Sequence, residues 1–118
     1  GAIVYLRKIF EMVTVQTADS MGIEYPKYEG GNPKNFSALL EKVDAECSII
    51  PIEFSKNGKR LFKELSNVVH GDFDEELGLK KFEPLHRLVI GILENVRNKE
   101  EFKDAKKALG WPEEDEVS

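Results

Sequence analysis

Apolar residues recur every three or four positions along the first part of the chain, which is the spacing of one face of an α-helix. This spacing predicts a helix of about five turns that ends before Gly22, because glycine readily adopts the backbone conformation that stops a helix. The row consists of Ile3, Leu6, Ile9, Phe10, Val13 and Met21, with Thr17 completing it.

The next segment, residues 25–34 (YPKYEGGNPK), is dense in glycine, proline and asparagine and predicts a loop. Asn32 and Pro33 are expected to cap and start a second helix, since proline at the first helical position gives up an N–H that has no partner. Ser48 and Pro51 mark the next boundary. The buried face of this second helix is predicted to be Phe36, Leu39, Leu40, Val43 and Cys47.

A third helix is predicted from about Ile52 to His70, with a break near Asn57 and Gly58 because glycine weakens a helix interior. At about 100° per residue its two faces differ in character. The core face is expected to hold Phe54, Leu61, Phe62, Leu65, Val68 and Val69. The opposite face carries the basic row Lys56, Lys59, Arg60 and Lys63, followed by Asn67 and His70.

The remaining chain predicts an acidic connector (GDFDEELG, residues 71–78), a long fourth helix and a short fifth helix that ends at Gly110. An acidic tail, residues 112–118, follows. No alternation typical of a strand competes with these helices. We therefore expect an all-α, up-and-down bundle of four to five helices, forming a single domain over residues 1–118. The fourth helix has the row Phe82, Leu85, Leu88, Val89, Ile92, Leu93 and Val96, and the fifth has Phe102, Ala105 and Leu109.

The composition fits one folded domain. The chain has 118 residues, of which 41% are hydrophobic and 33% charged, enough for one core and too polar for a membrane protein. No segment predicts a membrane span or a signal peptide, so a cytoplasmic location is expected. The start Gly1-Ala2-Ile3 is typical of a domain excised from a longer protein. A lone cysteine, Cys47, predicts neither a disulfide nor a zinc site, and no cofactor is expected.

The basic row of the third helix has two interpretations. With a net charge of −5 the chain is not suited to coating nucleic acid, yet Lys56, Lys59, Arg60 and Lys63 at one-turn spacing could follow a phosphate backbone. The alternative is a solvated helix face.

His70 likewise has a structural interpretation, as a helix C-cap before Gly71, and a catalytic one, as a general base for a ribose hydroxyl. A metal site of His70, Asp72 and Asp74 is a third interpretation, based on a pattern too common to be specific.

The stretches YLRKIFEMV (5–13) and LFKELSNVVHGD (61–72), in this helix order, resemble the HEPN superfamily, and in particular bacterial HEPN-like domains of defence and regulatory proteins. The resemblance covers about residues 3–98 and implies a helical bundle, usually a homodimer. In active members it implies a metal-independent endoribonuclease. The family motif places an arginine four to six residues before the histidine that His70 matches. This window holds Lys63, Glu64 and Leu65, and the arginine is absent.

The resemblance implies that Lys63 and Asn67 would assist His70 if the site were active. A lysine cannot grip a phosphate with two parallel hydrogen bonds as arginine does. The leading hypothesis is therefore a non-catalytic HEPN-like dimerisation or regulatory module, bound to other domains of its parent protein. The alternative is a weak or degenerate ribonuclease using His70, with Lys63 or Arg60 in place of the missing arginine. A third possibility is a nucleotide or small ligand bound between paired third helices, so an RNA or nucleotide ligand is among the expected partners. Ile90, expected on the polar side of the fourth helix, is a further hint of a partner.

Overall fold

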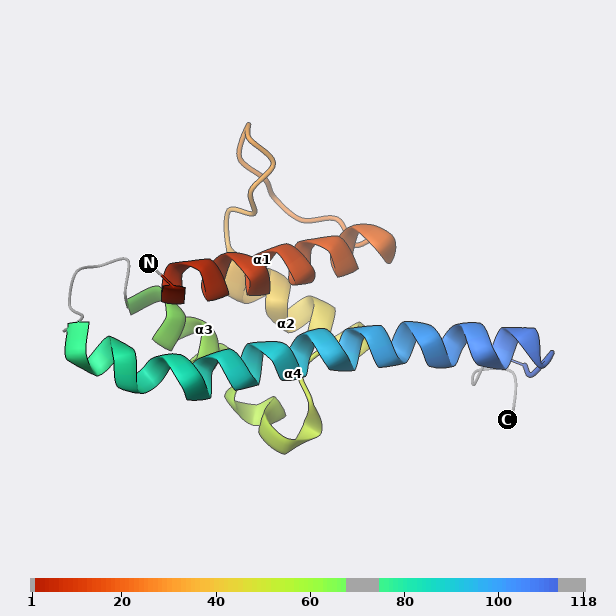
Figure 1. Cartoon of the computed structure of the whole chain (residues 1–118). Helices are drawn as coiled ribbons and strands as arrows, with labels where there is room; N and C mark the ends of the chain where they lie inside the picture. Colours follow the sequence, from red (N-terminus) through yellow and green to blue (C-terminus); the bar gives the residue numbers. More distant parts are fainter. Residues whose placement is uncertain (1, 68–74, 113–118) are drawn as a thin grey trace.

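The computed structural model describes residues 2–67 and 75–112. These residues form four α-helices and one 3-10 helix, and within them β-pairing is limited to an isolated bridge between Lys27 and Pro33. The all-α bundle expected from the hydrophobic pattern is confirmed. In this bundle α1 packs against α4, α2 and α3 (Figure 1). The elements are α1 (Ala2–Ser20), α2 (Phe36–Cys47), η1 (Ile52–Asn57), α3 (Gly58–Asn67) and α4 (Glu75–Ala108).

Helix α1 follows the predicted row closely and ends at the predicted glycine. Gly22 has φ +72°, and the N–H of Ile23 donates to the carbonyl of Ala18 at 2.9 Å, which closes the helix end. Thr17 is buried in the row, and its hydroxyl is satisfied there because it donates to the carbonyl of Val13 at 2.8 Å. Met21 does not belong to the row, since it follows the helix end and is exposed.

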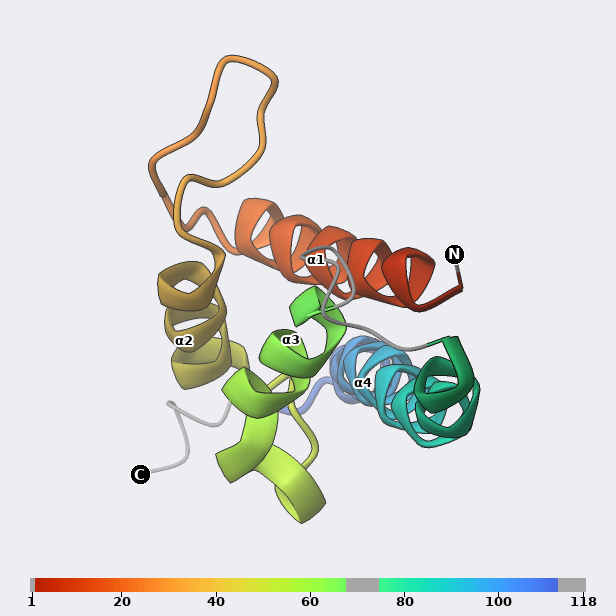
Figure 2. The same cartoon turned by 90° about the vertical axis from the view of Figure 1, so that its left-hand side faces the viewer.

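The segment between α1 and α2 projects from the bundle as a loop (Figure 1, Figure 2). At its base the hydroxyl of Tyr25 donates to Asp19 Oδ1 at 3.2 Å. Partial burial raises the pKa of Tyr25 above its ordinary value of 10.0, and the hydrogen bond and negative charge of Asp19 raise it further. Helix α2 starts three residues later than predicted. Its N-cap is Asn35, whose side chain accepts from the N–H of Ala38 at 3.1 Å, whereas Asn32 lies in the loop.

The predicted third helix divides at Gly58 into two elements. Before this glycine, η1 is a 3-10 helix in which Phe54 leaves helical geometry (φ −141°, ψ 26°), so a single helix from Ile52 is wrong and the predicted break is confirmed. Leu61 and Leu65 are buried, and Phe62 is half-buried, as the predicted core face requires. The predicted core residues at positions 68 and 69 lie outside the described residues.

The predicted fourth and fifth helices are one continuous helix of 34 residues, α4. It begins inside the predicted acidic connector at Glu75, and Pro84 lies within it. Its end agrees with the prediction. Gly110 has φ +73°, and the N–H of Trp111 donates to the carbonyl of Lys106 at 2.9 Å.

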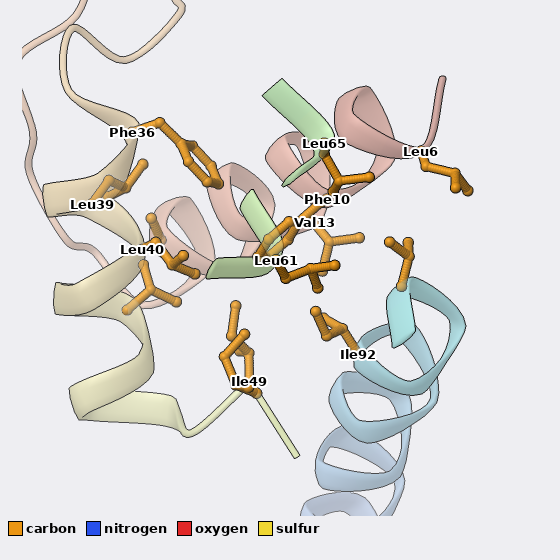
Figure 3. Close-up of a cluster of buried hydrophobic side chains, with 14 of the residues drawn as sticks. Leu6, Phe10, Val13, Phe36, Leu39, Leu40, Ile49, Leu61, Leu65 and Ile92 are labelled. Carbon is orange, nitrogen blue, oxygen red and sulfur yellow. The ribbon is translucent and has the colours of Figure 1, made fainter. Parts of the chain in front are cut away.

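The core lies where α1, α2, α3 and the middle of α4 converge (Figure 3). The rings of Phe10 and Phe36 pack edge to face with their centroids 5.6 Å apart, and the ring centroids of Phe36 and Phe62 are 4.4 Å apart. Asn95 anchors α4 to the segment after α2, because its side-chain amide donates to the carbonyls of Ser48 and Ile49, each at 2.9 Å. Within the described residues no helix is long and apolar enough to cross a membrane.

Candidate functional site

The basic row predicted for the third helix lies on the surface. Lys56, Lys59, Arg60 and Lys63 are all exposed, but Lys56 belongs to η1 and the other three to α3, so the break at Gly58 interrupts the row. Lys59 forms an ion pair with Glu41 of α2 at 3.1 Å, in which both side chains are more than half exposed. Such exposed pairs contribute little to stability.

The residues of the HEPN-like motif are only partly described. Asn67 is the last residue of α3, and His70 lies outside the described residues. Of the three positions where the family arginine could stand, position 65 holds Leu65, which is fully buried. Position 64 holds Glu64, whose Oε2 forms an ion pair with Nζ of Lys81 on α4 at 2.8 Å. Lys63 is exposed, whereas the Glu64 side chain is 37% exposed and engaged with Lys81. A cation in the window can therefore reach solvent from position 63.

Metal binding finds no support in the described part of the chain, where no three His, Cys, Asp or Glu residues are grouped to hold an ion. The residues of the third interpretation of His70, His70 with Asp72 and Asp74, lie outside the described residues.

A second surface feature, which the sequence did not predict, is an apolar groove of about 170 Å³ between α1 and α4. We call it the α1–α4 groove. Phe82 and His86 form part of its wall, and their rings are stacked with centroids 5.4 Å apart and planes within 8° of parallel. Tyr5, which also lines it, is 65% exposed. Its lining residues are Ala2, Tyr5, Leu6 and Ile9 of α1 and Phe82, His86, Val89, Ile90 and Leu93 of α4.

The groove corrects the expected placement of Ile90. Ile90 is half-buried at the groove, against the expectation that it stands exposed among charged residues. The reason is that α1 lies along this side of α4, so a residue just beside the core row still contacts a neighbouring helix. A signal was present in the sequence. Tyr5, Ile9 and Met12 are spaced four and three apart, and they define a second apolar row beside the core row of α1.

A third feature is the C-terminal part of α4 with the residues that follow it, Arg97 to Pro112, which we call the arm. The arm extends beyond the other helices of the bundle (Figure 1). Its largest apolar side chains are exposed, by 63% for Phe102, 64% for Leu109 and 61% for Trp111. Proteins seldom leave several large apolar side chains exposed close together without a partner.

Comparison of the chain with protein-family models, with curated proteins and with solved structures gave no match. The resemblance to the HEPN superfamily therefore stays a prediction that rests on the helix order and the short motif around His70.

Proposed function

We propose that this chain is a HEPN-like module that acts by self-association, and that it thereby regulates or assembles a larger bacterial defence- or stress-related protein without catalysing a reaction itself. The observation that carries the proposal is the set of large apolar side chains that α1, α4 and the residues just after α4 leave exposed. Tyr5 and Met12 of α1, Phe102 of α4, and Leu109 and Trp111 just after α4 are all more than half exposed. Protein association surfaces are enriched in tyrosine, tryptophan, phenylalanine and methionine.

The chemistry of the motif supports a non-catalytic role. Cleavage of RNA by this route needs a base together with a cation held on the developing negative charge, and removal of one such donor typically slows catalysis by about a hundredfold or more. Lys63 is the exposed cation nearest to that role, and it is a single point charge on a long flexible stem.

Multi-angle light scattering after gel filtration tests self-association directly. The wild-type chain should elute with a mass that rises from one copy towards two copies as the protein concentration is raised. A mass of one copy at every concentration up to the millimolar range would refute the proposal.

A second candidate function is binding or slow cleavage of RNA by the basic row on η1 and α3. It is favoured by the exposure of Lys56, Lys59, Arg60 and Lys63, since phosphate contacts by such residues need no base recognition. The test uses single-stranded RNA in excess EDTA with the wild type, His70→Ala and Lys63→Arg. Efficient cleavage that His70→Ala abolishes would replace the non-catalytic proposal, whereas activity in Lys63→Arg alone would identify a degenerate site.

A further inference from the structure

The arm carries a stripe of apolar residues that cannot reach the core of its own chain. At about 100° per residue, Phe102, Ala105 and Leu109 lie within an arc of roughly 60° on one side of the helix. Leu109 continues the last turn, because its N–H donates to the carbonyl of Ala105 at 3.1 Å. The centre of this stripe is rotated by roughly 140° from the side of α4 on which Val89 and Ile92 are buried.

The charges beside the stripe are divided by sign. Glu94 and Glu101 lie along one edge, and Lys99 and Lys106 lie along the other. In the heptad notation of coiled coils, Phe102 and Leu109 take position a, Ala105 takes d, the two glutamates take g and the two lysines take e. This arrangement is asymmetric, so it distinguishes between the two ways in which identical helices can pair.

Parallel pairing matches these charges, and antiparallel pairing does not. In a parallel pair each g residue lies beside the e residue five positions later in the other helix, which places Glu94 near Lys99 of a second copy and Glu101 near Lys106 of that copy. An antiparallel pair would bring lysine against lysine and glutamate against glutamate. The glutamates are available for exchange, because their ion pairs with Arg87 (3.1 Å) and Arg97 (3.4 Å) are largely exposed and therefore weak.

We propose that a second copy of this chain pairs in parallel with the arm, through Phe102, Ala105 and Leu109. This inference rests on the proposed self-association and names the surface that carries it. Because the arm is already helical as part of α4, pairing does not have to order it first.

The bundle limits how far the pairing extends. Two turns before Phe102, Asn95 takes position a and already contacts its own chain, because its side-chain amide donates to the carbonyls of Ser48 and Ile49, each at 2.9 Å. One turn earlier still, on the same side, a Cβ on Gly91 would lie 3.8 Å from Phe54 and 3.9 Å from Pro51. The two helices must therefore diverge towards their bundles. A contact of fewer than two heptads buries less than the roughly 800 Å² per partner of a standard interface, so we expect a weak dimer that forms only at high protein concentration.

The first test measures this equilibrium in variants by sedimentation or light scattering of the full chain. Phe102→Ser with Leu109→Ser should raise the dissociation constant at least tenfold, with an unchanged circular dichroism spectrum because both side chains are exposed. Tyr28→Ser is the matched control, since Tyr28 is 59% exposed on the loop far from the arm, and it should leave the equilibrium unchanged.

The second test distinguishes parallel from antiparallel pairing. In a Cys47→Ser background, Asn98→Cys places a thiol at position d, where parallel helices bring the same residue of two copies together. Oxidation should yield a covalent dimer, whereas Asp104→Cys, on the outer side of the arm, should not.

If the wild type dimerises but Phe102→Ser with Leu109→Ser does not weaken the dimer, or if Asn98→Cys does not cross-link, the arm pairing is wrong and self-association stands. If the wild type is monomeric throughout, the proposed function fails as well.

Discussion

Replacing Ile92 with alanine tests whether the middle of α4 forms part of the core. Ile92 is 1% exposed and points from α4 towards side chains of the other helices (Figure 3). The substitution removes three buried carbon atoms, worth about 0.8 kcal/mol each or about 2.4 kcal/mol together. An unrelaxed cavity of about 60 Å³ would add about 1.4 kcal/mol. The higher helix propensity of alanine offsets a few tenths of a kcal/mol of this loss in the free energy of unfolding. We expect the free energy of unfolding to fall by about 3 kcal/mol.

Urea unfolding followed by far-ultraviolet circular dichroism measures this loss, and the slope against urea should be unchanged. Tryptophan fluorescence is a poorer probe, because Trp111 is exposed on the arm and does not report on the core. Leu79→Ala is the control on the same helix. Leu79 is 75% exposed, so its replacement should change stability by less than about 0.5 kcal/mol. A loss below about 1 kcal/mol for Ile92→Ala would refute the placement of Ile92 in the core.

Three further predictions concern the N-cap of α2, the hydrogen bonds of Asn95 and the pKa of Tyr25. Asn35→Ala should lower the free energy of unfolding by about 1 kcal/mol by uncapping α2, while Asn32→Ala, a change of the same kind in the loop, should have a smaller effect; equal losses in urea unfolding would contradict the cap. Asn95→Ala removes two hydrogen bonds and should lower the free energy of unfolding by about 1–3 kcal/mol, and unchanged stability would contradict the anchoring of α4 by Asn95. Because the folded chain holds the phenolic proton of Tyr25 more tightly than the unfolded chain does, its contribution to stability is complete below about pH 10 and is lost as the pH rises through the folded pKa. Ultraviolet difference titration should show that Asp19→Asn lowers the pKa of Tyr25 towards 10.0, without removing the part caused by burial, and an unchanged titration would contradict the hydrogen bond to Asp19.

The sequence predicted the parts of the fold that depend on burial. Leu6, Phe10 and Val13 repeat at helical spacing because they share one face of α1, and all three are buried. Helix ends were predictable where glycine was needed, as at Gly22 with φ +72°. The start of α2 was misplaced because Asn32 and Asn35 are chemically equivalent caps. Only the hydrogen bond from Ala38 to Asn35 distinguishes them.

The continuity of α4 was not predictable from periodicity, because its apolar row changes direction along the helix. Residues up to Val96 follow one face, and Phe102, Ala105 and Leu109 follow a face rotated by roughly 140°. A change of phase looks like a break between two helices when every apolar row is assumed to face one core. In α4 the helix continues without core contact, supported by good helix formers and by the pair of Arg97 with Glu101 at 3.4 Å. The second face is then a surface that faces solvent or a partner.

The candidate site was predictable as a set of residue types and not as a geometry. Lys63, Glu64 and Leu65 are consecutive letters, yet one is exposed, one forms an ion pair with α4 and one is fully buried. Sequence spacing treats the three positions as equivalent places for an arginine, because the motif counts residues and does not specify helix faces. On α3 an arginine at position 65 would enter the core, and one at position 64 would replace the carboxylate that pairs with Lys81. Among these three positions, only position 63 can therefore take a phosphate-binding arginine without disturbing the core or the pair with Lys81. Lys63→Arg is for this reason the change that best separates a degenerate ribonuclease from a module that acts by association.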